Sequence, residues 1–237
     1  MNKEEFVLEI KKLKIEPQEK QLKKLNLYFD LLVEWNNKFN LTSILEEKDV
    51  FLLHFYDSLC LIRTCDLSKN LVLCDFGTGA GFPGMVIALV FNNINVTLVE
   101  SNNKKCIFLK EVSNKLHLQN VNVVCARVED FAKNNREKFD IVTCRAVTSI
   151  PVIIELSTAL IKVSGYLLPL KSNCKEEISE YKYLEKEFNL ELEDLIEYNL
   201  PYNDAVRMIP KYKKNNKTSK VYPKNYSAII KKYGKRK

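Results

Sequence analysis

Four of the six glycines in this 237-residue chain lie within eight positions, in the segment Asp75–Gly84 with the sequence DFGTGAGFPG. Glycine has no side chain to pack, so such a cluster predicts backbone that must approach a ligand closely. A buried strand is predicted before this turn, over 71–76, and a helix after it, over 85–91, with Pro83 in the first helical turn. A strand, a glycine turn and a helix N-terminus present free backbone N–H groups, which predicts a site for a nucleotide-like cofactor.

Two spacings of these glycines indicate different cofactors. Gly79-x-Gly81-x-x-Gly84 matches the dinucleotide fingerprint, in which a helix N-terminus faces a pyrophosphate. That fingerprint starts directly after a strand, whereas Asp75 and Gly77 come between the strand and Gly79 here. The spacing Asp75-x-Gly77-x-Gly79-x-Gly81 is similar to the first motif of S-adenosylmethionine-dependent methyltransferases, whose cofactor has no phosphate for Asp75 to repel and has cationic groups that suit it. Methyl transfer is therefore favoured, and a nicotinamide (NAD)-dependent oxidoreductase stays the alternative.

The elements around the turn alternate between strand and helix. Strands are predicted over 71–76, 95–100, 120–125, 139–145 and 164–171, weaker ones over 191–199 and 204–209, and helices over 103–116 and 150–162. This alternation predicts an α/β fold: a doubly wound, mostly parallel Rossmann-like sheet with helices on both faces. Ligands bind at the carboxyl ends of such strands, which selects Asp75–Gly81, Glu100, Ala126–Glu129, Arg145 and Lys171. Glu100 ends its strand about where a ribose diol would bind, whichever cofactor is used.

The two ends of the chain differ from this middle part. The first 65 residues contain no glycine, and apolar residues such as Leu22, Leu25 and Tyr28 recur at steps of three and four, so a helical cap is predicted over 1–65. From Ala205 onward there are twelve Lys or Arg and no acid, which leaves −5 of the net charge of +7 for residues 1–204 (7 − 12 = −5). We therefore predict a cofactor-binding domain over 66–210 and a basic tail over 211–237.

Four tyrosines, Tyr212, Tyr222, Tyr226 and Tyr233, are interleaved with the cations of the tail. Basic side chains neutralise phosphates and aromatic rings stack on bases, so the tail is predicted to contact nucleic acid. A solvated tail that only aids solubility is the alternative.

Composition excludes several other classes of protein. No stretch approaches the ~20 apolar residues that span a membrane, and the N-terminus lacks the apolar core of a signal peptide. The seven cysteines are never spaced C-x-x-C, and with two histidines they form no zinc-binding pattern. We predict a cytoplasmic monomer with reduced thiols that binds neither a membrane nor a metal.

Further segments are shared with a known family. They are WNNKFNLTS at 35–43, HFYDS at 54–58, the turn with its FPG ending, ES at 100–101 followed by KK at 104–105, RVE at 127–129, CRA at 144–146 and Lys171. With these segments the chain resembles the bacterial rRNA small-subunit methyltransferase G family, also called the glucose-inhibited division protein B family. Members of that family methylate guanine N7 in 16S ribosomal RNA. The chain departs from the family pattern at Leu53, where a basic residue is common, at Ser172, where glycine is usual, and at Lys224, where arginine is usual.

The resemblance implies S-adenosyl-L-methionine as the cofactor, and 16S ribosomal RNA or the small ribosomal subunit as the partner. Cofactor contacts are expected at Gly77, Phe82, Val128, Glu129 and Arg145, to which the strand ends add Asp75, Gly79, Gly81 and Glu100. RNA contacts are expected at Arg127 and Lys171 and, in the basic tail and just before it, at Arg207, Lys211 and Lys224.

The implied reaction needs position more than proton transfer. Guanine N7 has a lone pair and no hydrogen, and the methyl donor is already activated by its own charge, so no catalytic base is predicted. Positioning candidates are His54, Asp57, Ser58 and Arg145; for the first three, a plain structural role explains the sequence almost equally well. A protein that binds RNA without catalysis, on a relict cofactor fold, is a further alternative.

Overall fold

A computed structural model describes residues 1–234 and shows one seven-stranded sheet in the order β3-β2-β1-β4-β5-β7-β6. The strands are β1 Leu71–Phe76, β2 Ile94–Glu100, β3 Val121–Cys125, β4 Phe139–Arg145, β5 Ile161–Leu170, β6 Leu190–Asn199 and β7 Val206–Lys214. The first five strands are parallel, and β7 pairs antiparallel with both β5 and β6. The predicted doubly wound, mostly parallel sheet is confirmed. The three last tail cations, Lys235, Arg236 and Lys237, lie outside the described residues.

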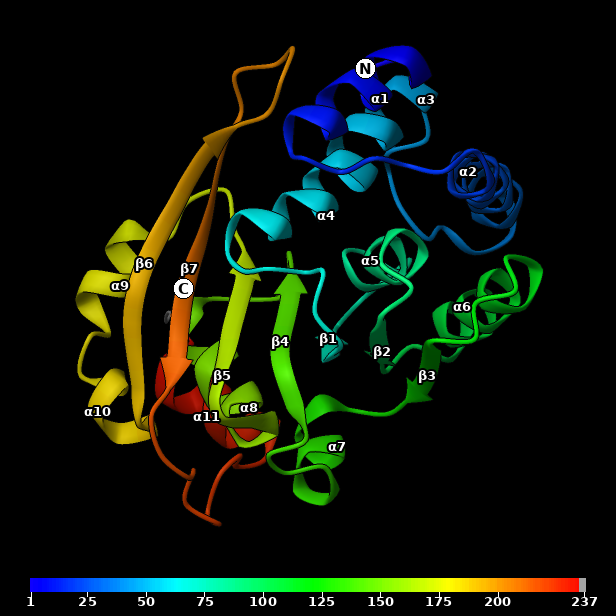
Figure 1. The fold of residues 1–237 in the computed structure, drawn as a ribbon. Helices are drawn as coiled ribbons and strands as arrows, with labels where there is room; N and C mark the ends of the chain where they lie inside the picture. The colour runs from blue at the N-terminus through cyan, green and yellow to red at the C-terminus, as the bar shows by residue number, and fades with distance from the viewer. Residues whose placement is uncertain (235–237) are drawn as a thin grey trace.

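The helices fall into an N-terminal group, a group that connects the strands, and a C-terminal helix after β7 (Figure 1). The N-terminal group comprises α1 Lys3–Lys12, α2 Glu19–Phe39, α3 Glu47–Asp49 and α4 Asp57–Leu59, with a π-helical segment Val50–Tyr56 and a 3₁₀ turn Cys60–Arg63. The others are α5 Gly84–Val90, α6 Asn103–Lys115, α7 Val128–Asn134, α8 Ile150–Ser157, α9 Lys175–Glu180, α10 Leu184–Phe188 and α11 Tyr226–Tyr233. A 3₁₀ turn, Thr158–Leu160, leads from α8 directly into β5, so α8 ends earlier than the predicted helix over 150–162.

Buried side chains form one core on each face of the sheet. In β1, Leu73 belongs to the first core, whereas Cys74 and Phe76 belong to the second, as expected for a strand whose successive side chains point to opposite faces. The N-terminal helices, α5 and α6 cover the first face, and α7, α8, α10 and α11 cover the second. Both faces are therefore apolar, which explains why β1 and β4 appear in the sequence as continuous apolar runs.

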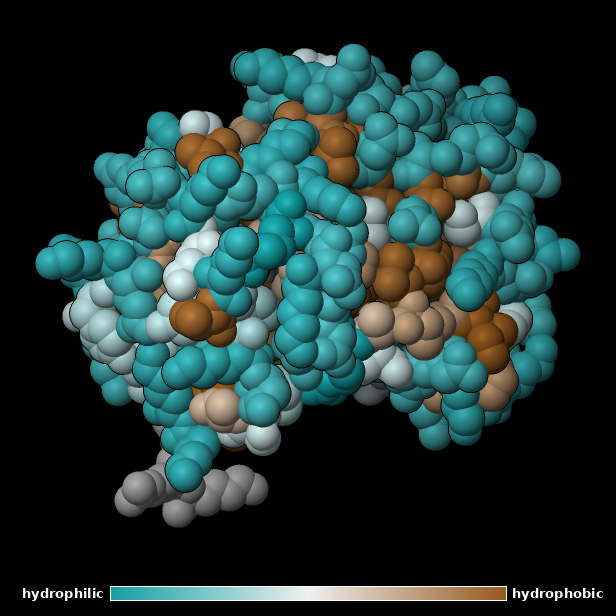
Figure 2. Space-filling model, turned by 90° about the horizontal axis from the view of Figure 1, so that it is seen from below, coloured by the Kyte–Doolittle hydropathy of each residue, from teal (hydrophilic) through white to brown (hydrophobic). Residues whose placement is uncertain are grey.

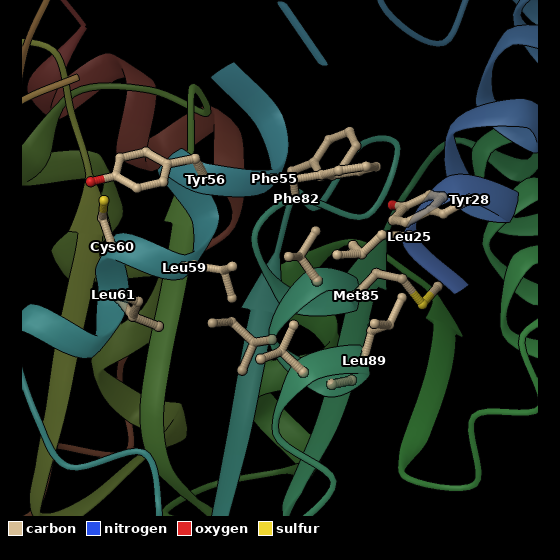
Figure 3. Packing of buried hydrophobic residues seen from close by; sticks show 14 of the residues in the cluster. Leu25, Tyr28, Phe55, Tyr56, Leu59, Cys60, Leu61, Phe82, Met85 and Leu89 are labelled. Atoms are coloured by element: carbon tan, nitrogen blue, oxygen red, sulfur yellow. The ribbon is translucent and has the colours of Figure 1, made fainter. Parts of the chain in front are cut away.

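The N-terminal helices pack on the sheet through aromatic side chains. The ring of Tyr28 on α2 lies 5.5 Å from the rings of both Phe55 and Phe82, measured between centroids. Figure 3 shows these three rings between the helices of the cap and Met85 of α5. The Tyr28 hydroxyl also donates to the backbone oxygen of Ala80 in the glycine turn. The cap is thus fixed directly to the turn that the sequence assigns to the ligand.

The C-terminal segment is part of the fold. The predicted boundary at residue 210 falls inside β7, and Lys214 at the end of that strand is completely buried. Its Nζ donates to the backbone oxygens of Thr158, at 3.0 Å, and Ile161, at 2.8 Å, and burial lowers its pKa to about 8. Two of the four tail tyrosines, Tyr212 and Tyr233, are buried as well, so they do not stack on RNA bases as the tail interpretation proposed.

Residues 1–234 contain neither a helix that could span a membrane nor a cluster of metal-ligating side chains. None of the helices described is both long and apolar enough to cross a bilayer. Within residues 1–234, His, Cys, Asp and Glu form no group of three or more that could hold a metal ion, and the seven cysteines have free thiols. Figure 2 shows that the underside of the molecule is mostly hydrophilic, with hydrophobic side chains gathered on the half that contains β1, β2 and β3.

Candidate active site

The glycine turn has a backbone that other residues would adopt only with strain. Gly77, Gly79 and Gly81 have φ values of 62°, 61° and 104°, in the region that favours glycine. The fourth glycine, Gly84, has another reason: a Cβ there would lie 2.8 Å from the Cβ of Asp75. Three glycines therefore shape the loop, and the fourth lets α5 pack against β1.

Asp75 lies behind the turn and not in a cavity. It is completely buried, and its Oδ2 accepts hydrogen bonds from the Thr78 hydroxyl at 2.5 Å and from the Gly84 N–H at 2.8 Å. Burial raises the pKa of the Asp75 carboxyl to about 7, against the opposing effect of these two hydrogen bonds. The geometry gives Asp75 a role in holding the turn, and the cofactor contact expected from the sequence stays a prediction.

Glu100, at the end of β2, also holds the turn. One carboxylate oxygen accepts from the Gly79 N–H at 3.0 Å, and the other accepts from the Asn102 N–H at 2.8 Å. Its side chain is buried, so the remaining lone pairs can face only groups placed directly against the turn. Glu100 fixes the backbone conformation at Gly79 whatever else it binds.

The larger of two cavities at the turn lies between the cap and the carboxyl ends of the strands and has a volume of about 710 Å³. Its lining comes from the cap (Leu41, Thr42, Ile44, Leu53, His54, Asp57), the turn (Gly77–Ala80, Phe82), the start of α6 (Lys105), the ends of β4 and β5 with the residues that follow them (Arg145, Ala146, Leu170–Asn173), α9 (Glu177) and the start of β7 (Arg207). We call it the large cavity. Its walls combine apolar side chains with four basic ones.

Arg145 joins the cap to the end of β4. Its Nη1 donates to the backbone oxygen of Leu53 at 2.7 Å and to Oδ2 of Asp57 at 3.1 Å, and its Nη2 donates to Nδ1 of His54 at 3.0 Å. Asp57, almost fully buried, also accepts from the Tyr198 hydroxyl at 2.9 Å. A buried carboxylate without such partners would be strongly destabilising, so this network binds the cap to β4 and β6.

His54 is neutral in this network. Burial, followed by the charge of Arg145, lowers the pKa of its imidazole to about 3. Because a guanidinium only donates, Nδ1 must accept, which puts the proton on Nε2, 3.2 Å from the Thr42 hydroxyl. The ring stacks on Phe82 at 4.3 Å with 15° between the planes. Ser58 points elsewhere: its hydroxyl donates back to the oxygen of His54 at 2.5 Å and is fully buried, so it serves the helix and not the cavity.

The smaller cavity, of about 110 Å³, lies on the other side of Gly77. It is lined by Phe76, Gly77, Val99, Ser101, Ala126–Glu129, Val147, Leu156 and Tyr226. Glu129 is almost fully buried there; its Oε1 accepts from Nε of Arg127 at 3.2 Å, and its Oε2 has no hydrogen-bond partner within residues 1–234. We call this the small cavity. A ligand or a water that donates a hydrogen bond would satisfy this oxygen.

The two cavities together fit a ligand with two different ends. Gly77 lines both of them, so a ligand that occupies both must cross bare backbone at this residue. A Cβ at Gly77 would lie 2.7 Å from Val147 Cγ2, whereas a Cβ at Gly79 would find nothing closer than Lys105 Nζ at 4.0 Å. The turn is thus tight at one glycine and open at the next.

Comparison with known proteins decides the family. A family model described as rRNA small subunit methyltransferase G matches residues 21–204. Proteins named ribosomal RNA small subunit methyltransferase G from Lysinibacillus sphaericus and Bacillus subtilis are each 40% identical over 227 residues, covering 94% of this chain and 95% of theirs. The chain belongs to the rRNA small subunit methyltransferase G family.

Solved structures agree with this family in fold. TYW2 of M. jannaschii, solved in complex with AdoMet, has a TM-score of 0.52 and 18% identity over 62% of this chain and 70% of its own. YcgJ of Bacillus subtilis has a TM-score of 0.55 and 12% identity over 69% of this chain and 100% of its own. Likeness at these identities supports the shared sheet architecture and says nothing of the substrate.

The residues expected to contact RNA do not lie together. Lys171 and Arg207 line the large cavity, where Lys171 donates to the Thr148 oxygen at 3.0 Å and Arg207 lies 3.6 Å from Asp57. Arg127 lines the small cavity, and Lys211 pairs with Glu193 at 3.3 Å on the outer strands. Lys224 lies in the segment before α11, 5.9 Å from the ring of Tyr222. Three of these five residues, Arg127, Lys171 and Arg207, therefore line a cavity, whereas Lys211 and Lys224 line neither.

Several residues at the site were missed by the sequence analysis. Thr42, Lys105, Val147, Tyr198 and Tyr226 all contact a cavity or the Arg145 network. Thr42 and Lys105 lie within segments shared with the family, so that signal was present. Tyr198 and Tyr226 are far from the glycine turn in sequence, and only the fold brings them to it.

Proposed function

We propose that this protein, as a member of the rRNA small subunit methyltransferase G family, transfers a methyl group from S-adenosyl-L-methionine to N7 of a guanine in 16S ribosomal RNA. The observation that supports the site most directly is the pair of cavities joined at Gly77. The family supplies the substrate class, and the glycine turn supplies a place for a cofactor with two ends.

The adenine end suits the small cavity. Adenine has a flat apolar ring and an exocyclic amine that donates hydrogen bonds, and the small cavity offers Val99, Val128 and the free Oε2 of Glu129. The ribose would then lie over Gly77, with Glu100 close behind the turn. Val128 and Glu129 keep the role that the sequence gave them, and Asp75 takes a supporting one.

The amino-acid end and the target base suit the large cavity. Lys105 and Lys171 face this space and match either a carboxylate or an RNA phosphate. Arg145 has its donors directed to Leu53, His54 and Asp57, so we assign it to positioning the cap and not to a free ion pair with the ligand. Phe82 lines the large cavity, and its packing against His54 and Tyr28 keeps this apolar part of the wall rigid.

When bound, the cofactor supplies an activated methyl group, and the protein's task is to hold N7 in line with it. No side chain has to remove a proton, since N7 has none. The neutral state of His54 agrees with this: its Nδ1 accepts from Arg145, and its Nε2 is beside Thr42. The residues of the large cavity therefore orient the base and exclude water, and none of them is assigned as a general base.

The test is to map methylation on 16S RNA from a strain that lacks the gene and from the same strain complemented with it. Chain cleavage by borohydride and aniline is specific for N7-methylguanine, so one cleavage site should disappear in the first strain and return in the second. Titration of the purified protein with S-adenosylhomocysteine and with NADH separates the alternatives: binding of NADH alone would support an oxidoreductase, and binding of neither would support an RNA-binding protein without catalysis.

A further inference from the structure

One residue of the small cavity comes from a distant part of the chain. Ten of its eleven lining residues lie between Phe76 and Leu156, at the carboxyl ends of β1 to β4 and in the elements that follow them. The eleventh is Tyr226, the first residue of α11. The C-terminal segment therefore reaches the side of the glycine turn that is opposite to the cap.

Tyr226 and the Glu129 carboxylate of this cavity both contact the same side chain, that of Arg127. The guanidinium carbon of Arg127 lies 4.6 Å from the centroid of the Tyr226 ring, a cation–π contact. The Nε of the same arginine donates to Oε1 of Glu129 at 3.2 Å, which leaves Oε2 of Glu129 without a hydrogen-bond partner in the described part of the chain. Arg127 thus neutralises Glu129 on one side and holds an aromatic ring on the other.

The position of Tyr226 is fixed by the rest of the segment. Arg136 donates to the backbone oxygens of Tyr222, at 2.6 Å, and Thr218, at 2.7 Å, and so holds the loop before α11. The side chain of Asn225 accepts from the Ala228 N–H and caps the helix. On the other side of α11, Ile229 is buried in the core of the second face. Tyr226 itself keeps 38% of its surface exposed.

We propose that Tyr226 closes the adenine side of the cofactor site. Its ring would lie against the adenine base, and the exocyclic amine of that base would donate a hydrogen bond to Oε2 of Glu129. The proposal rests on the proposed function, since it places the adenine end in the small cavity. It makes Tyr226 a positioning residue for the cofactor. It also assigns Arg127 to the cofactor site, although the sequence alone suggested a contact with RNA.

Calorimetry with two ligands tests this in the full-length protein. S-adenosylhomocysteine has both ends, whereas methylthioadenosine lacks the amino-acid end, so a defect on the adenine side weakens both ligands by the same factor. We expect Tyr226→Ala to weaken each about tenfold, a contact of the size that aromatic stacking provides on a base. Tyr226→Phe should retain most of the affinity, because the ring is kept.

The matched control is Tyr183→Ala, which removes another exposed tyrosine that lines neither cavity. It should leave both affinities unchanged, and affinity for a 16S RNA fragment should be the same in all three variants. Equal binding of both ligands by wild type and a folded Tyr226→Ala overturns the proposal, as does loss of RNA binding with cofactor affinity intact. Failure of the wild-type protein to bind either ligand would instead contradict the proposed function.

Discussion

The two ends of this chain both fold back to the glycine turn, but they are attached in different ways. The cap reaches it through buried groups: the rings of Tyr28 and His54 on Phe82, and the ion pair of Asp57 with Arg145. The C-terminal segment has buried anchors of its own, such as Lys214 and Ile229, but beside the turn it contributes only the half-exposed ring of Tyr226 on Arg127. Buried charges and rings are costly to separate, whereas exposed contacts exchange with water at little cost. The cap side of the site should therefore be rigid and the adenine side adaptable.

The largest effect is expected from removing the part of the C-terminal segment that belongs to the sheet. Truncation after Met208 removes most of β7 and with it Lys214, whose ammonium satisfies the oxygens of Thr158 and Ile161. We expect this truncation to abolish cooperative unfolding, measured by circular dichroism during heating. Truncation after Lys220 keeps all of β7 and should leave a folded protein with a lower melting temperature. Equal melting of both truncations and the full chain would show that the whole segment is a solvated appendage.

On the cap side, Arg145→Ala should be the most damaging single substitution. It leaves Asp57 buried with only Arg207, at 3.6 Å, as a cation, and loss of one partner of a buried pair costs about 3–5 kcal/mol. Methylation of 16S RNA should fall by orders of magnitude, because the cap loses its contact with β4. Urea unfolding measures the loss of stability, and an assay of tritiated methyl transfer to 16S RNA measures the loss of activity. Arg145→Lys, which restores the charge but not the three directed hydrogen bonds, should recover part of the stability and little activity.

His54 predicts a pH dependence for the cap. Its pKa is about 3 in the folded protein, against 6.5 for an ordinary histidine, so below pH 6.5 the unfolded chain binds a proton that the folded chain does not. Stability from this residue is present above pH 6.5 and is lost as the pH falls. Between pH 6.5 and pH 5 the loss should approach about 2 kcal/mol, from 1.36 kcal/mol per pH unit.

His54→Gln, which cannot titrate, should lack this decrease when urea midpoints are compared at the two pH values. Asp75 acts in the opposite direction: its pKa of about 7 lies above its ordinary value, so its contribution is present at low pH and is lost as the pH rises from about 4 to 7. As the pH falls, the free energy of unfolding should therefore decrease more steeply in Asp75→Asn than in the wild type, and less steeply in His54→Gln. The same slope of stability against pH in both variants would contradict the shifted pKa values of His54 and Asp75.

Arg136→Ala should have the smallest effect of the series. It removes three hydrogen bonds from a guanidinium to backbone oxygens of the loop before α11, those of Tyr222, Thr218 and Ser219, at a cost of about 1.5–3 kcal/mol. Limited proteolysis should then cut the segment after Thr218 faster, while the cap stays protected. Faster cleavage in the cap as well would mean that the stability of the cap depends on the C-terminal segment, and that the two ends of the chain are not attached independently.

The sequence predicted the sheet well because its signals are local. Apolar runs, the glycine turn and the charged strand ends identify β1 to β5 and the edge where Gly77, Glu100, Glu129 and Arg145 meet. Side-chain partners were not predictable in this way. Asp75 holds the turn because the Thr78 hydroxyl and the Gly84 N–H donate to it, and the spacing of residues in the sequence does not reveal these hydrogen bonds.

The buried contacts of the C-terminal segment could not be predicted for a related reason. Composition shows twelve cations and four tyrosines but not which of them are buried, and Lys214 and Tyr212 are. A run of basic residues predicts a solvated tail unless some of them satisfy backbone oxygens inside the protein. The division of the chain into cap, cofactor domain and tail, the monomeric state and the absence of a metal stay predictions.

The sharing of Gly77 by the two cavities has a consequence for inhibitor design. Two small molecules, one a purine analogue and one an amino-acid analogue, would sit on opposite sides of a residue that has no side chain to separate them. A short linker across Gly77 would turn the second binding event into an intramolecular one, so the linked compound should bind far more tightly than either part. The shortest linker that spans the glycine without bending its backbone defines the best candidate.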